Sequence, residues 1–195
     1  MNEQRRQFLR SFGLVAAGAL GGWALPSFLQ HYVNAEGEQD GISPETRIKQ
    51  LKIVLPKPTK PKNTYVPTVR VGNLLYVAGH GPGSVDGKPV VGKVGRDLNL
   101  EQAQQAARLA GLRILGAVRA AVGSLDNVVR LVKTLGMVNA TPDFKDQPLV
   151  INGFSDLIVE IFGEKRGKGA RSAVGMGSLP GGIPVEIETI FQIRT

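Results

Sequence analysis

The segment Val185–Ile193 predicts a β-strand with one buried face. Mostly apolar side chains recur at every second position, with mostly polar ones between them. Val185, Ile187, Thr189, Phe191 and Ile193 share one side, and Glu186, Glu188, Ile190 and Gln192 share the other. Successive side chains of a strand point to opposite faces of its sheet. This strand therefore needs a sheet that is covered on one face.

Other periodic segments place two helices between strands. Strands are predicted at 66–71, 74–78, 128–138 and 171–177. A first helix begins at a cap, Asn99, and carries an apolar stripe that is mostly alanine, namely Ala103, Ala107, Ala110, Ile114, Ala117 and Ala121. A second helix carries Val150, Phe154, Leu157, Ile158 and Ile161 and ends at Gly163. The order strand–strand–helix–strand–helix–strand–strand favours an α+β domain with both main helices packed on one face of the sheet.

Composition excludes several kinds of site. The chain has 195 residues, 42% of them hydrophobic, which suits one domain with an appendage. It contains no cysteine, so disulfides and thiolate metal sites are excluded, and no cluster of His and Asp residues suggests a metal site. The net charge is +8, but no stacking aromatic side chains accompany the basic residues, so we do not expect a nucleic-acid partner.

The N-terminus has the pattern of a twin-arginine export signal. Arg5 and Arg6 precede an apolar run, 12–25, which is rich in Ala and Gly and is followed by Pro26. The run is shorter than the roughly 20 apolar residues that span a bilayer. We therefore expect residues 1–35 to be a signal peptide that the twin-arginine translocase reads, and the protein to be periplasmic. An uncleaved signal that anchors the protein to the membrane is the alternative.

Two further parts follow the signal. Residues 36–63 are expected to hold a short helix, which begins at Ser43 and Pro44, and then a linker rich in Pro and Lys. Residues 64–195 are expected to form the domain.

Arg171 is the first candidate binding residue. It lies among small residues in a predicted strand, and its planar fork of donors matches a carboxylate. If 180–183 formed a tight hairpin, Arg171 would face position 192, roughly 20 Å from Glu186 at ~3.3 Å per residue. Either the hairpin is irregular, or Arg171 meets Glu186 of a neighbouring subunit. We favour the second interpretation.

Several motifs resemble the RidA/YjgF family, also called the L-PSP endoribonuclease or chorismate-mutase-like family. They are Tyr65–Asn73, Leu74–Gly81, Gln147–Leu157, the Ala-Arg-Ser of 170–172 and the Val-Glu-Ile-Glu of 185–188. The resemblance runs from about Tyr65 onward. The sequence of its Asn-Gly-x-Ser-Asp-Leu motif is most similar to a less-studied branch of the family. It implies a chorismate-mutase-like fold and a homotrimer with clefts between its subunits.

The resemblance also implies a chemistry. Family deaminases hydrolyse small enamines or imines of the 2-aminoacrylate type to keto acids and ammonia, without a metal or organic cofactor. By this resemblance Arg171 holds the substrate carboxylate, Glu186 orients water or passes a proton, and Tyr65 and Asn152 line the cleft. The partner is thus a small metabolite that carries a carboxylate.

The chain departs from the better-known deaminases at three positions of the cleft. Ala78 replaces a serine, His80 stands where glutamine is usual, and Ala173 replaces a cysteine or similar residue. These changes remove polar contacts, so a non-catalytic trimer that binds small carboxylates or keto acids is the alternative function. Ribonuclease and chorismate mutase activities rank lower, because a shared fold does not imply a shared reaction.

Each site residue also has a structural interpretation. Arg171 could form an ion pair at a subunit interface, and Glu186 could lie on a solvated strand face. Tyr65 could pack at a strand end, and Asn152 could bond locally within its helix.

Overall fold

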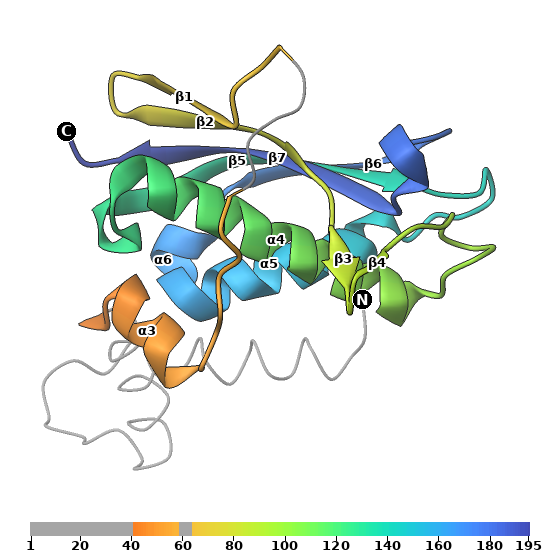
Figure 1. Cartoon of the computed structure of the whole chain (residues 1–195), viewed down its shortest axis with the longest axis horizontal. Helices are drawn as coiled ribbons and strands as arrows, with labels where there is room; N and C mark the ends of the chain where they lie inside the picture. The colour runs from red at the N-terminus through yellow and green to blue at the C-terminus, as the bar shows by residue number, and fades with distance from the viewer. Residues whose placement is uncertain (1–40, 59–63) are drawn as a thin grey trace, which may run out of the picture. The chain divides into compact units, whose positions relative to one another are not determined.

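The computed structural model of the chain describes residues 41–58 and 64–195, and a five-stranded sheet forms one of its layers (Figure 1). The strands are β1 (Thr68–Val71), β2 (Leu74–His80), β5 (Val128–Asn139), β6 (Ala170–Met176) and β7 (Val185–Ile193). They lie in the order β1-β2-β7-β5-β6, and neighbouring strands are antiparallel except for β5 and β6, which are parallel. The predicted signal at 1–35 lies outside the described residues.

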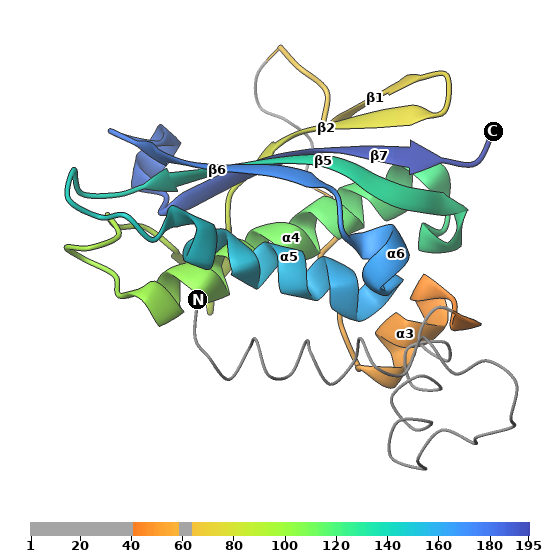
Figure 2. The ribbon, with the colours of Figure 1, turned by 180° about the vertical axis from the view of Figure 1, so that it is seen from behind.

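Two long helices, α4 (Leu100–Val122) and α5 (Gln147–Phe162), cover one face of this sheet (Figure 2). The predicted α+β layering is therefore confirmed. Asn99 and Gln102 cap α4 reciprocally, each side chain accepting a hydrogen bond from the other residue's backbone N–H. The predicted stripe of α4 is buried except at Ala121. That part of the prediction is wrong: residues 119–121 are all exposed, although the next residue, Val122, still packs against the core.

Two glycines let α4 and α5 approach closely. A Cβ atom at Gly153 of α5 would lie 2.0 Å from the backbone carbonyl oxygen of Gln104 in α4. A Cβ at Gly111 of α4 would lie 2.9 Å from the Leu157 side chain of α5. The spacing of the helical layer therefore depends on these two positions.

The helix α3 (Pro44–Gln50) packs on the end of α4 through the carboxylate of Glu45. Its Oε1 accepts a hydrogen bond from the backbone N–H of Leu125 at 3.0 Å, and its Oε2 accepts one from Arg119 at 2.6 Å. Ser43 caps α3, as predicted. The shorter elements are β3 (Ser84–Val85), β4 (Lys88–Pro89) and α6 (Glu164–Gly167).

The two faces of the sheet differ in what covers them. On β7, the predicted alternation is confirmed: Val185, Ile187, Thr189, Phe191 and Ile193 are buried toward the helices. On the opposite face, the described elements leave apolar side chains exposed, including Val69, Val71, Tyr76, Val174 and Met176. We call this second face the open face.

Within residues 41–58 and 64–195, no helix combines the length and apolar character needed to cross a membrane. In the same residues, no group of three His, Asp or Glu side chains is arranged to hold a metal ion.

Candidate functional site

Arg171 lies on the edge strand β6, and its side chain turns toward α5. Its Nη1 donates hydrogen bonds to Asn152 Oδ1 and Ser155 Oγ, each at 2.9 Å. Asn152 and Ser155 are three residues apart on α5 and so lie on one helical face. The residue remains exposed, and its Nε and Nη2 donate to none of the described residues. These donors are therefore available to a planar anion such as a carboxylate.

A cavity of about 170 Å³ adjoins Arg171 between β5, β6 and α5. Ser155, Lys168 and the buried Thr134 also line it. Within the described part of the chain, the hydroxyl of Thr134 has no hydrogen-bond partner. A buried hydroxyl is costly without a partner, so Thr134 is suited to bond a ligand or water in this cavity. Lys168 is ion-paired with Glu164, so Arg171 is the cation of this cavity that can bind a small anion, with the two hydroxyls beside it.

Ser155 is one residue of this site that the sequence did not single out. We expect Ser155→Ala to weaken carboxylate binding by about tenfold, because Arg171 loses one of the two acceptors that orient it. Calorimetric titration with pyruvate would measure this change, with Ser178→Ala in the exposed connection after β6 as the control. An unchanged affinity would show that Asn152 alone positions the guanidinium.

Glu186 lies on the open face, over the backbone of β2. A Cβ atom at Gly79 would lie 2.1 Å from Glu186 Oε1, so only glycine leaves room for this carboxylate. Burial, with a smaller contribution from the neighbouring Glu188, raises the pKa of Glu186 above its usual value. Glu186 therefore holds its proton to a higher pH than an ordinary glutamate does, which suits a group that exchanges protons with a substrate.

The raised pKa of Glu186 makes a prediction about stability. The folded state holds this proton at pH values where the unfolded state has released it, so ionisation costs stability as the pH rises through the raised pKa. We expect Glu186→Gln to raise the free energy of unfolding at pH 7, and the gain to disappear below the ordinary value of 4.5. Urea unfolding at pH 7 and at low pH would test this, with the exposed Asp156→Asn as the control. A gain that is equal at both pH values would contradict it.

Within one chain, the structure does not bring Arg171 and Glu186 together. They lie on opposite faces of the sheet, and β5 separates their strands. Arg171 pairs in register with Thr134 of β5, whereas Glu186 pairs with Met137. The hairpin register expected from the sequence, with Arg171 opposite position 192, is therefore wrong. The expectation that these two groups meet only between subunits stays a prediction.

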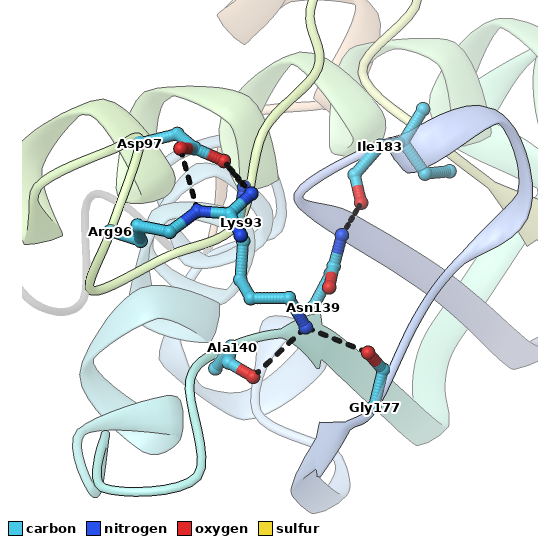
Figure 3. A network of polar contacts seen from close by, with 7 residues as sticks. All are labelled: Lys93, Arg96, Asp97, Asn139, Ala140, Gly177 and Ile183. Atoms are coloured by element: carbon cyan, nitrogen blue, oxygen red, sulfur yellow. Dashed lines mark hydrogen bonds and ion pairs between the residues drawn. The ribbon is translucent and has the colours of Figure 1, made fainter.

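The connection from β6 to β7 explains the failed register, because it crosses the end of β5 (Figure 3). Lys93 donates through Nζ to the carbonyl oxygens of Gly177 at 2.7 Å and Ala140 at 3.4 Å. Asn139 donates through Nδ2 to the carbonyl oxygen of Ile183 at 3.2 Å. These contacts tie the crossing connection to the end of β5, so β6 and β7 flank that strand instead of pairing with each other.

Two further expectations concern the surroundings of Arg171. Tyr65 is 53% exposed and precedes β1, the strand at the opposite edge of the sheet from β6. Tyr65 and Arg171 are therefore not neighbours within one chain. Of the small residues that share a side with Arg171, Ala173 is half-buried, and Gly175 and Gly177 are exposed. Ala173 packs against the core, and Gly175 lies beside Gln147 of α5.

Comparison with known proteins identifies the family. The family model described as "YjgF/chorismate mutase-like, putative endoribonuclease" matches residues 45–180. The chain belongs to this YjgF family. The match spans Tyr65, Asn152 and Arg171 but ends before Glu186. The family resemblance drawn from the sequence is thus confirmed.

Individual relatives support the YjgF assignment. Protein TCP17 of Trypanosoma cruzi is 39% identical over 75% of this chain and 92% of its own length. The crystal structure of Atu1372 from Agrobacterium tumefaciens, a protein of unknown function, is 42% identical with a TM-score of 0.69. That comparison covers 82% of this chain and 98% of Atu1372. A Shewanella oneidensis structure matches with a TM-score of 0.73 at 25% identity, over 78% of this chain and all of that one.

Proposed function

We propose that this YjgF-family protein binds small metabolites that carry a carboxylate, and hydrolyses reactive enamines or imines of the 2-aminoacrylate type. The observation that supports this proposal is the exposed guanidinium of Arg171, which Asn152 and Ser155 hold in place. Because both contacts use Nη1, a substrate carboxylate can accept a bidentate pair from Nη2 and Nε. The adjoining cavity of about 170 Å³ suits a substrate of a few heavy atoms.

In the proposed reaction, the enamine first tautomerises to the imine: its β-carbon takes a proton from solvent, and its nitrogen releases one to solvent. The oxygen of one water then bonds to the imine carbon. The carbon–nitrogen bond breaks, and nitrogen leaves as ammonia while the carbonyl of the keto acid forms. Glu186, with its raised pKa, takes the two protons of the water one after the other and passes each to the nitrogen, the first on addition of water and the second as the carbon–nitrogen bond breaks. The overall reaction consumes one water per substrate and needs no redox partner.

This chemistry requires a second copy of the chain, because Glu186 and Arg171 lie on opposite faces of one sheet. We propose that, in a homotrimer, the open face of one subunit packs against the β6 edge of the next and brings Glu186 of the first toward Arg171 of the second. Exposed apolar side chains on the open face, such as Val69, Tyr76 and Val174, favour such contacts.

Sedimentation equilibrium tests the trimer. We expect the full chain to sediment at three times its monomer mass of 20.8 kDa. Tyr76→Glu should shift it toward monomer, because a charge would be buried in the contact. Val54→Glu is the matched control, since Val54 is 83% exposed and lies outside the sheet. A monomer at micromolar concentration would contradict the shared site.

A non-catalytic carboxylate binder is the second candidate function. Ala78 and Ala173 supply no polar group at two positions where family deaminases have one, which favours binding without turnover. Ammonia release from freshly generated 2-aminoacrylate separates the two candidates. We expect the wild-type protein to accelerate release well beyond the spontaneous rate. If pyruvate protects the protein against unfolding but the release rate stays spontaneous, the hydrolase proposal fails and the binder remains.

We also propose that Arg5 and Arg6 direct the chain through the twin-arginine translocase to the periplasm. A reporter fused after residue 40 should reach the periplasm, and replacing both arginines with lysine should retain it in the cytoplasm. Recovery of the fusion in the membrane fraction would favour the uncleaved anchor instead.

A further inference from the structure

A second pocket lies on the helix-covered side of the molecule, between α4, the loop after β2 and the segment 56–58. Its volume is about 230 Å³. It shares no lining residue with the cavity beside Arg171. Its walls are largely apolar, and Pro56, Pro58, Pro82, Leu109 and Leu112 form them. Pockets that bind small molecules commonly have such apolar walls with a few polar groups among them.

The charged groups of this pocket are all basic. Lys57 and Arg113 line it, and none of its described lining residues is acidic. Neither cation forms a hydrogen bond or ion pair with any residue in the described part of the chain. Two unpaired cations on apolar walls leave a local excess of positive charge that an organic anion would neutralise.

Close packing fixes these groups in place. A Cβ atom at Gly83 would lie 2.3 Å from Arg113 Nη1, so the guanidinium lies directly against the loop backbone. Gly83 has a φ of +79°, which favours glycine, so the loop is tied to this conformation. On the other wall, a Cβ at Gly116 would lie 2.3 Å from the carbonyl oxygen of Pro56. The segment 56–58, which carries Lys57, therefore packs directly against α4.

His80 adds a neutral polar group. Its Nδ1 lies 2.7 Å from the carbonyl oxygen of Ala78, and this geometry requires Nδ1 to carry the proton. Burial lowers the pKa of His80, and the positive charge of Arg113 adds to that shift. The lowered pKa favours the neutral imidazole, so His80 adds a polar group to the pocket without a further charge.

We propose that this pocket is a second binding site, distinct from the Arg171 site, for a small organic carboxylate with a branched apolar body. Arg113 and Lys57 bind the carboxylate, and the proline and leucine walls contact the hydrocarbon part. The proposal does not depend on the function proposed for Arg171, because no residue is shared.

The test uses the full chain with 13C-labelled leucine methyl groups. NMR titration with 4-methyl-2-oxopentanoate should produce saturable shifts at Leu109 and Leu112, in the wild type and equally in Arg171→Ala. The neutral ketone 4-methylpentan-2-one has the same hydrocarbon body and should bind at least ~10-fold more weakly. Arg113→Gln should weaken binding of the acid by about tenfold or more. Arg108→Gln, on the same helix and with the same charge change, should alter it by less than about twofold.

Lys57→Gln should also weaken binding of the acid. If Arg113→Gln does not fold, Lys57→Gln takes its place as the test of the carboxylate contact. Absence of saturable shifts at both leucines would overturn the proposal. So would equal affinity for the acid and the neutral ketone, or an affinity that Arg113→Gln and Lys57→Gln leave unchanged. Loss of the shifts in Arg171→Ala would place the ligand at the other site and would equally reject it.

Discussion

Replacing Arg171 with alanine is expected to weaken pyruvate binding by about 100-fold or more, since two charge-assisted hydrogen bonds are lost. The rate of ammonia release from 2-aminoacrylate should fall at least as far. The fold should be retained, because Arg171 is exposed and its two contacts are with polar side chains on the surface of α5. Calorimetric titration and a single-turnover assay measure the two effects separately.

Two variants control for charge and for geometry. Arg130→Ala removes an exposed arginine from β5 and should leave pyruvate binding unchanged. Arg171→Lys keeps the charge but loses the planar fork, so it should recover only part of the affinity. If Arg171→Lys bound as tightly as the wild type, a point charge would be sufficient and the bidentate interpretation would be wrong.

Gly153→Ala is expected to lower the free energy of unfolding by roughly 2–3 kcal/mol through overpacking. In an ordinary helix interior the same change would stabilise by up to ~1 kcal/mol, because alanine is the better helix former. Here the added Cβ would lie 2.0 Å from the backbone carbonyl oxygen of Gln104, which cannot rotate away. The helices would have to separate, and the adjacent Asn152 would move away from Arg171.

Gly177→Ala is the matched control for this prediction. No atom lies within 4 Å of the position where its Cβ would be, and its φ is not positive. Urea unfolding should therefore place Gly177→Ala close to the wild type. A Gly153→Ala protein as stable as the wild type would mean that α4 and α5 are not in the close contact described.

Local patterns in the sequence were sufficient to predict the individual elements. The alternation of β7, the cap at Asn99 and the terminating Gly163 each depend on neighbours within a few residues. The burial predicted for Ala121 was wrong, because helical spacing does not show how far the core covers a helix.

The order of the strands could not be predicted in the same way. Two strands joined by a short connection usually pair, and that expectation produced the wrong register for Arg171. The actual arrangement places β5 between them, and contacts between residues distant in sequence, from Lys93 to Gly177 and from Asn139 to Ile183, secure it. No local signal reports such contacts.

The candidate site was predictable only in part. The family motifs indicated Arg171 and Asn152, and the structure joins their side chains directly. Ser155 follows Asn152 by three residues in the same motif, so helical spacing was a usable signal for it. Thr134 carried no such signal, because its place beside Arg171 follows from the parallel pairing of β5 and β6.

A crystal structure of the assembled protein soaked with pyruvate tests the central claim most directly. It should show both carboxylate oxygens within hydrogen-bond distance of Arg171 Nε and Nη2, with Glu186 of the partner subunit facing the same ligand. A guanidinium enclosed in a dry subunit contact, with pyruvate elsewhere or absent, would contradict the account.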